Sequence, residues 1–324
     1  MTIKITEKGK LSLAAFSNET DTNDMIRGLV IDACGGEWDY YKFQENKYKV
    51  FAVLAELMPA SMQASLGSAF DRFAEFKDTA MGDENAFIVP DNKLFPVYTV
   101  ARGMVAERQR VDNKSISVAT EMKMINVYTE LDEFLAGKVD WAGMNNRIMA
   151  SFANHTAGLI YNAISDSYAS IVAGVKTTGA FDADTLMGIV EQVQAYSGSA
   201  EVAIFGSKRS LRQVADIAGY SDAEKERFNN FGYYGTFAGT DLLEIPQAFV
   251  NGTNTLTLSN SQLLIVPTNG EKIVKVAYEG APFVGMTEAI DRNDLQPQIM
   301  YGRRIGVAAL TAPDGQYGIY NITA

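Results

Sequence analysis

The longest periodic pattern in the chain runs from residue 141 to residue 173. Apolar and aromatic residues recur there at intervals of three and four, at Trp141, Met144, Ile148, Phe152, Leu159, Ile160, Ile164, Tyr168 and Ile171. This spacing places them on one slowly rotating face of an α-helix. With Asp140 as N-cap and Gly174 as the glycine that ends it, the helix would be roughly 50 Å long, far above the average. We expect it to be the spine of the fold.

Two segments before this helix have the composition of strands, residues 94–105 and residues 115–125. In the second, apolar Ile116, Val118, Met122 and Met124 alternate with polar Ser115, Ser117, Glu121 and Lys123, which is the period of a strand with one buried face. The tip between them has no large apolar cluster and carries Arg102, Glu107, Arg108, Arg110, Asp112 and Lys114. A two-stranded hairpin is marginally stable alone, so we expect this excursion to lie over another surface.

The second half of the chain alternates between helical and strand patterns. A helix is predicted over 182–196, with Leu186, Ile189, Val190 and Val193 on one face. A buried strand over 201–205 precedes a helix over 207–218 capped by Ser207, and a polar helix follows from Ser221 to Gly232. Further strands are predicted at 262–266, 274–278, 297–310 and 316–322, with a turn at 313–315. This order predicts an α+β fold.

Composition narrows the classes of function. The 324 residues include 47% hydrophobic and 21% charged residues, as in ordinary globular proteins, and the net charge is −11. Dedicated nucleic-acid binding calls for a basic surface, so we do not expect it. Cys34 is the only cysteine, which excludes an internal disulfide. No apolar run approaches the length of a membrane span, and we see no signal peptide, so we expect synthesis in the cytoplasm and no membrane contact.

Candidate chemistry is sparse. His155 is the only histidine, and its position predicts a packed, hydrogen-bonded side chain on the face of the long helix. With one histidine and one cysteine, a zinc site of the Cys/His type cannot form. Residues 206–210 (GSKRS) open a helix after a strand, where an anion could bind, but we expect a capped helix with solvated cations instead. We expect no catalytic residues, no cofactor and no metal site.

The order of elements resembles that of the major capsid proteins of tailed bacteriophages, whose shell fold is shared with encapsulins. Three sequence segments are most similar to this family. They are ELDEFLAGKVDW before the long helix, AIFGSKRSLRQVADI, and GYYGTFAGTDLLEIPQAF leading to LLIVPTNGEKIVKV. The resemblance implies an N-terminal arm (1–45), a helical segment (46–87), an extended two-stranded loop (88–125), a peripheral domain with the spine helix (126–197), an axial α/β domain (198–290) and returning peripheral strands (291–324). It covers nearly the whole chain.

The resemblance also implies a function, that of a structural subunit without enzymatic activity. Copies would form pentamers and hexamers of an icosahedral shell in the virion, after synthesis in the cytoplasm of a bacterial host. Expected partners are a scaffolding protein, unless the N-terminal arm takes its place, together with a portal and decoration proteins. DNA is expected to be enclosed but not bound sequence-specifically. Expected contacts between subunits are Arg102, Glu107, Arg108, Arg110 and Lys114 in the loop, and Tyr233 and Tyr234 near the capsomer centre. The alternatives are an encapsulin-like compartment shell and a soluble α+β enzyme or ligand-binding protein.

Overall fold

The computed structural model describes most of the chain. The described residues are 28–29, 31–37, 39, 41–53, 55, 70–89, 95–110, 113–130, 141–198, 201–215, 222–245, 247, 249–268, 271–287, 296, 298–310 and 317–323. Most of the expected N-terminal arm, the expected caps Asp140 and Ser221, and the expected turn at 313–315 lie outside these residues.

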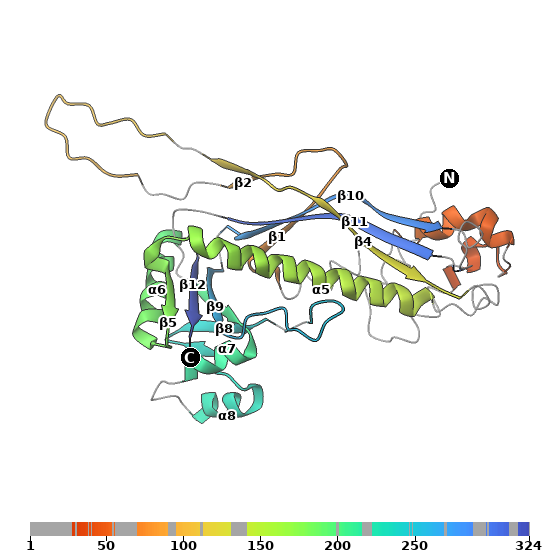
Figure 1. The fold of residues 1–324 in the computed structure, drawn as a ribbon. Helices are drawn as coiled ribbons and strands as arrows, with labels where there is room; N and C mark the ends of the chain where they lie inside the picture. Colours follow the sequence, from red (N-terminus) through yellow and green to blue (C-terminus); the bar gives the residue numbers. More distant parts are fainter. Residues whose placement is uncertain are drawn as a thin grey trace.

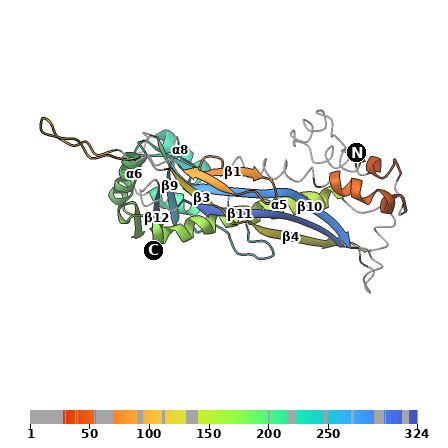
Figure 2. The same ribbon diagram turned by 90° about the horizontal axis from the view of Figure 1, so that it is seen from above.

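An elongated four-stranded sheet lies along the spine helix. Its strand order is β1-β10-β11-β4, with β1 at Ala74–Thr79, β10 at Val274–Thr287, β11 at Gln298–Ala309 and β4 at Glu121–Tyr128. Helix α5 (Trp141–Ser167) packs against β10 and β11, and the view from above shows the strands side by side along it (Figure 2). The buried residues of α5 are apolar apart from two. The Thr156 hydroxyl donates to the carbonyl of Phe152 at 2.8 Å, and the Ser167 hydroxyl at the end of the helix donates to the carbonyl of Ile164 at 2.6 Å.

The long helix ends earlier than expected. It stops at Ser167, and two short 3-10 turns follow at Tyr168–Ser170 and Ala173–Val175, so Gly174 does not end an α-helix. The Lys176 ammonium donates to the carbonyls of Tyr168 and Ala169, at 3.0 Å each. These carbonyls follow the end of α5, where no further helical turn would supply their donors. A lysine from the next strand therefore helps to fix the end of the spine, and the helical periodicity alone could not show this.

A compact six-stranded sheet lies at one end of the molecule (Figure 1). Its strand order is β5-β12-β9-β6-β8-β7, and the strands are β5 (Lys176–Gly179), β12 (Gly318–Ile322), β9 (Gln262–Pro267), β6 (Val202–Gly206), β8 (Thr240–Glu244) and β7 (Thr236–Phe237). Helices α6 (Ala183–Ser197) and α7 (Lys208–Arg212) pack on it, and α8 (Asp222–Phe231) follows.

Several sequence predictions are confirmed in this region. The buried residues of α6 are the four expected ones, its N-cap Asp182 accepts from the amide of Thr185 at 3.0 Å, and Gly198 ends it at a φ of 64°. The Ser207 side chain accepts from the amide of Ser210 at 3.3 Å, which confirms the cap of α7. That helix is shorter than predicted and continues as a 3-10 turn over Gln213–Ala215. Gly232, with a φ of 87°, ends α8 as expected.

The last strand differs from the expectation that residues 291–324 return together to the peripheral sheet. Strand β11 does join β10 and β4, but β12 pairs with β9 and β5 in the compact sheet. The Tyr320 hydroxyl on β12 accepts from the amide of Asp182 at 2.9 Å and donates to the Ala180 carbonyl at 2.5 Å, which ties β12 to the start of α6. The domain boundaries themselves remain predictions.

The expected hairpin is built from other residues than predicted. Strand β2 (Ala86–Val89) pairs with β3 (Lys114–Ser117), whereas described residues 95–110 contain no strand. The second predicted strand is interrupted at residues 118–120, before β4 begins. Because of this break, the even-numbered side chains point to the buried face before it and to the exposed face after it. Val118 is buried, whereas Met122 and Met124 are 43% and 50% exposed. The single alternating face predicted for 115–125 is therefore wrong.

Candidate assembly surfaces

A long loop projects from the body of the subunit at the end that holds the compact sheet. Its described part is residues 95–110, and both views show it extending beyond α6 (Figures 1 and 2). A turn closes its tip, where the amide of Met104 donates to the Ala101 carbonyl at 3.0 Å and Gly103 has a φ of 91°. The Gln109 side chain donates to the Pro96 carbonyl at 2.8 Å and so joins the two limbs.

The structure places the charged residues of the predicted contact on this loop. Arg102, Glu107, Arg108 and Arg110 are all exposed. Lys114 is the first residue of β3, and Asp112 lies outside the described residues. The described loop carries a net charge of +2 on a chain of −11. Its charge is thus opposite to that of the subunit as a whole.

The loop also exposes large apolar side chains that the sequence analysis did not identify as a group. Every described residue of the loop is exposed, and the large hydrophobic ones are Phe95 at 53%, Val97 at 97%, Tyr98 at 44%, Val100 at 46%, Met104 at 69% and Val105 at 89%. The sequence does contain a signal for this exposure. A half-buried strand is apolar at only every second residue, whereas this segment is apolar at both odd and even positions. An exposed apolar patch of this kind marks an interaction surface.

The base of the loop is held on the face of the four-stranded sheet that is opposite α5. Phe87 of β2 and Val118 pack against Ala277 of β10 in a small separate cluster. Gly306 of β11 lies under the returning segment, where a Cβ atom would come within 2.4 Å of the carbonyl oxygen of Ala119. Only glycine allows this close approach, so the sheet fixes the position of the chain between β3 and β4.

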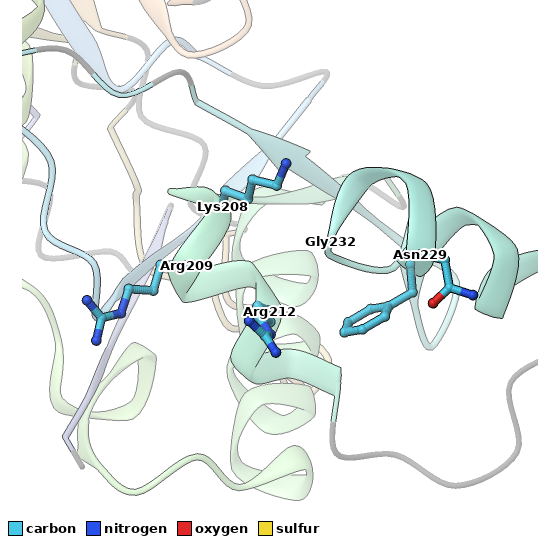
Figure 3. Close-up of a pocket in the computed structure, with 6 residues that line it drawn as sticks. Lys208, Arg209, Arg212, Asn229 and Gly232 are labelled. Carbon is cyan, nitrogen blue, oxygen red and sulfur yellow. The ribbon is translucent and has the colours of Figure 1, made fainter.

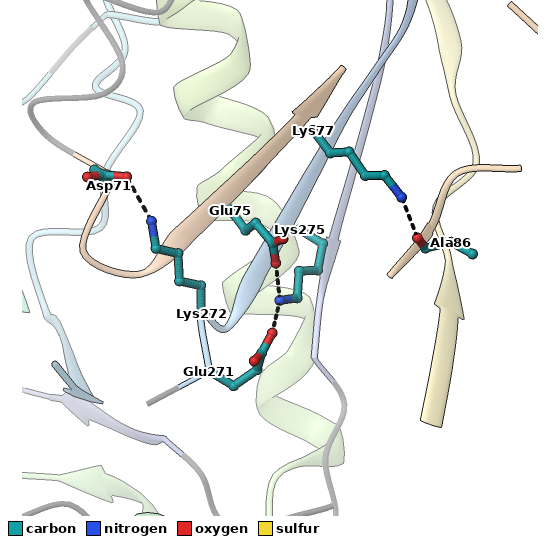
Figure 4. Close-up of polar contacts among 7 residues, drawn as sticks. All are labelled: Asp71, Glu75, Lys77, Ala86, Glu271, Lys272 and Lys275. Carbon is teal, nitrogen blue, oxygen red and sulfur yellow. Dashed lines mark hydrogen bonds and ion pairs between the residues drawn. The ribbon is translucent and has the colours of Figure 1, made fainter. Parts of the chain in front are cut away.

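Polar contacts complete this attachment. The Lys77 ammonium donates to the Ala86 carbonyl at 2.8 Å, which joins β1 to β2 (Figure 4). Glu279 of β10 is 6% exposed and accepts from the Thr120 hydroxyl, from the amide of Gly82 at 3.1 Å and from the Arg304 guanidinium at 3.3 Å. These donors, with Thr120 first, lower the pKa of Glu279 from 4.5 to about 2. The carboxylate thus links both ends of the hairpin to the sheet.

A buried lysine lies beside the same attachment. Lys275 is fully buried and forms ion pairs with Glu75 and Glu271 (Figure 4). Its ammonium also lies 5.8 Å from the centre of the Phe87 ring, in cation–π contact with β2. A buried charge needs such partners, because an uncompensated one is strongly destabilising. Lys275 therefore belongs to the internal structure of the subunit.

Of the two tyrosines expected at the capsomer centre, one is buried in its own subunit and the other is half-buried, and their contact with another subunit remains a prediction. Tyr233 is 9% exposed and belongs to the subunit's own hydrophobic core, so its side chain has little surface to offer a neighbour. Burial is the main cause of its raised pKa. Tyr234 is half-buried against Phe228 of α8, with ring centres 4.9 Å apart. The aromatic residues of a segment do not show by themselves whether they pack in the core of their own subunit or form a contact with another subunit.

The prediction for His155 is wrong, because its side chain is exposed. Thr156 occupies the buried position on α5 instead, four residues after Phe152 and four before Ile160. Partial desolvation lowers the pKa of His155, and the nearby Lys123 adds to this effect.

Among the described residues, no helix is both long and apolar enough to cross a membrane. Among them, no group of three or more His, Cys, Asp or Glu side chains is arranged to hold a metal ion.

The fold is similar to those of capsid subunits. One similar structure is the mature capsid of bacteriophage PhiM1, with a TM-score of 0.56, 11% identity and coverage of 78% of this chain and 86% of that one. Another is the capsid of the native GTA particle, with a TM-score of 0.55, 11% identity and coverage of 79% and 90%. A third is from Gordonia phage Cozz, with a TM-score of 0.50, 15% identity and coverage of 79% and 87%. These similarities confirm the expected capsid shell fold.

Sequence comparison gives the family. No curated protein matches the chain. A family model described as "SPbeta prophage-derived putative capsid protein YonB" matches residues 2–311. The match covers nearly the whole chain, including the loop, the spine helix and every strand of the two sheets except β12. The chain belongs to this YonB family of capsid proteins.

Proposed function

We propose that this chain is the shell subunit of a tailed bacteriophage, and that its copies form pentamers and hexamers of an icosahedral capsid around the genome. The family and the fold support a structural role. The observation that carries the assembly mechanism is the loop at 95–110, whose described residues are all exposed and include six large apolar side chains. None of the described residues of the same subunit covers them.

The geometry favours a contact in which the loop of one copy lies on the body of another. The loop projects beyond the body, and its base is fixed to the sheet through Gly306 and Glu279. Contacts between different surfaces of identical subunits generate rings when the rotation closes. The positive loop and the negative subunit are complementary, which sets the register of the contact more than its affinity. The six apolar side chains of the loop supply the apolar surface that the contact buries.

The same proposal extends to partners and location. A separate scaffolding protein, a portal and decoration proteins would assist assembly in a bacterial cytoplasm, and the product would be part of the virion. The net charge of −11 supports enclosure of DNA without sequence-specific binding. No catalytic step is required for this role.

Two alternatives were considered. An encapsulin-like compartment shell would share the fold, but it is not favoured, since the family is one of prophage capsid proteins and the similar structures above are phage and GTA capsids. A soluble enzyme or ligand-binding protein would leave the exposed apolar loop unexplained.

The experiment that tests the proposal uses the purified full chain, with negative-stain electron microscopy and light scattering. We expect the wild-type chain to form rings, curved sheets or closed particles. The double variant Arg108→Glu, Arg110→Glu reverses the charge of the loop tip and should remain folded while particles no longer close. The control Arg108→Lys, Arg110→Lys keeps the charge and should assemble. A wild-type chain that stays monomeric under all assembly conditions contradicts the proposed function, and normal particles from the Glu variant contradict the role of the tip.

A further inference from the structure

The compact sheet carries a basic pocket that no function described above uses. The pocket has a volume of about 750 Å³ and lies between α7 and α8 (Figure 3). Its lining residues are Lys208, Arg209, Arg212, Phe228, Asn229 and Gly232. The Arg212 side chain lies in the space between the two helices, with Lys208 at the edge near Gly232 (Figure 3). A Cβ atom at position 232 would lie 2.9 Å from Cε of Lys208, so the glycine leaves room for the lysine.

The cations of this pocket are not neutralised within the described part of the subunit. None of the ion pairs found among the described residues includes Lys208, Arg209 or Arg212. Helix α7 has no acidic residue to balance them. Arginine in particular presents a planar fork that matches a carboxylate or a phosphate. The pocket is therefore built for an anionic group that this subunit does not supply from its described residues.

A complementary surface lies on α6 of the same chain. This helix contains acidic residues and no basic ones. Asp184, Gly188, Glu191 and Ala195 are separated by intervals of three and four, so they share the face opposite the buried residues. Both carboxylates are exposed, and no ion pair among the described residues includes either. Gly188 and Ala195 add little or no side chain to this face, so another chain can approach the helix closely.

The two surfaces lie on one face of the compact sheet, toward different edges. The strand register puts Gly318 of β12, Ile265 of β9 and Ile204 of β6 on the same face, and Gly206 shares it by alternation. Gly318 lies against Ile189 of α6, and Gly206 lies against Ser210 of α7. Helix α6 packs on β12, β9 and β6, and α7 packs on β9, β6 and β8, so α7 is displaced along the strand order toward the β8 edge. The acidic helix and the basic pocket therefore lie at different positions along the same layer. They are two different surfaces, so one copy can offer the first to one neighbour and the second to another, as in a heterologous contact.

We propose that the basic pocket of one copy receives the acidic face of α6 from the next copy around the ring, with Lys208 and Arg212 opposite Asp184 and Glu191. This inference rests on the proposed function and names one contact within it. Each copy uses both surfaces, so the contact is heterologous and can continue around a ring of five or six. The phosphate groups of nucleic acid could occupy the same pocket, and their binding is one of the outcomes of the test below.

The test uses charge reversal in the full chain. Variant A is Lys208→Glu, Arg212→Glu, and variant B is Asp184→Lys, Glu191→Lys. Each places like charges at every contact, so each alone should need a concentration at least about tenfold higher than wild type to assemble. The fourfold variant that combines A and B restores opposite charges and the wild-type net charge, and it should form closed particles. Circular dichroism on unassembled subunits establishes that all variants are folded.

A mixture of A and B gives a sharper result. Unlike neighbours attract in this mixture, so the two variants must alternate around each ring. Six positions can alternate, but five cannot, and we expect hexamer-based sheets or tubes without closed icosahedral particles.

For the single variants, a tenfold change in the concentration needed for assembly corresponds to about 1.4 kcal/mol per contact.

Several results would overturn the inference. These are normal assembly of A, failure of the folded fourfold variant, or a mixture that forms no rings. If A assembles normally but loses binding to short single-stranded DNA, the pocket binds phosphate groups and the inference is again overturned. Because wild type assembles in each of these cases, the proposed function would stand. If wild type itself does not assemble, the proposed function fails first.

Discussion

The two sheets of this subunit differ in how completely they are covered. Every residue of β6 in the compact sheet is buried, as is nearly every residue of β9 and β12. In the elongated sheet, β10 is buried from Val274 to Glu279, but from Gly280 onward its residues are half-buried or exposed. The change coincides with an irregularity in the pairing of β10 with β11 between Glu279 and Phe283, where Gly280 has a φ of 72°.

This difference separates two uses of apolar residues. The compact sheet buries them within one chain and should be stable alone, since buried apolar area is the main favourable term in folding. The elongated sheet and its loop leave apolar residues accessible, including Met122, Met124 and Tyr128 on β4 and the six in the loop. A monomer gains nothing from such exposure. We therefore expect substitutions in the first region to affect folding and substitutions in the second to affect assembly.

The largest effect on stability is expected in the compact sheet. Phe205 of β6 is 3% exposed and packs edge-on against Phe73, with ring centres 5.1 Å apart. Phe205→Ala leaves a cavity where both residues are buried, and it should lower the free energy of unfolding by about 3–5 kcal/mol. Urea denaturation of the unassembled subunit measures this. A loss below about 1 kcal/mol would show that the compact sheet does not depend on this packing.

A smaller effect is expected at the attachment of the loop. The lowered pKa of Glu279 means that the folded state prefers the carboxylate, so its contribution is present above pH 4.5 and is lost as the pH falls from about 4.5 toward 2. Acidification in this window should free the base of the hairpin before the compact sheet unfolds. Hydrogen exchange at the amide of Gly82, which donates to Glu279, reports this release.

A substitution separates Glu279 from other carboxyl groups. Glu279→Gln keeps the shape but removes the charged acceptor. The protection of the Gly82 amide, relative to an unstructured amide at the same pH, should therefore be on the order of tenfold lower at neutral pH and should change little between pH 4.5 and 2. Asp71→Asn is the matched control, because Asp71 pairs with Lys272 at 2.7 Å on the surface, and exposed pairs contribute little. Equal exchange in wild type and Glu279→Gln would exclude Glu279 as the attachment.

The accuracy of the sequence predictions follows the same division. The faces of α6 and the strand at β6 were predictable, because their periodic residues are buried inside the chain. The end of α5 was not, since it depends on Lys176 and on the Tyr317 hydroxyl, which donates to Ser167 at 2.8 Å across 150 positions of sequence. The change of face between Val118 and Met122 depends on the space above Gly306. No local pattern contains these distant partners.

The candidate site was predictable in its charges but not in its apolar contacts. Arg102 and Arg108 are exposed on the loop as expected, because charged residues seldom have another place in a hairpin tip. Val97 and Val105 both fall in the strand predicted over residues 94–105. The parity of the apolar residues argues against a half-buried strand there, but it does not say whether an apolar residue is covered by its own chain or by another copy. Tyr233 illustrates the same point in the opposite direction, since its own subunit buries it.

The smallest effect on stability is expected where the effect on assembly is large. Val97 and Val105 are 97% and 89% exposed, so Val97→Ser, Val105→Ser should change the free energy of unfolding of the unassembled subunit by less than about 0.5 kcal/mol. If a neighbour buries both side chains, each contributes about 1.5–3 kcal/mol to every contact, and particles should no longer form. The control Val97→Ile, Val105→Ile keeps the apolar surface and should assemble. Light scattering beside urea denaturation distinguishes the two effects. Particles that form normally from the Ser variant would mean that the loop is not an apolar contact, and a destabilised subunit would mean that these residues are covered by their own chain after all.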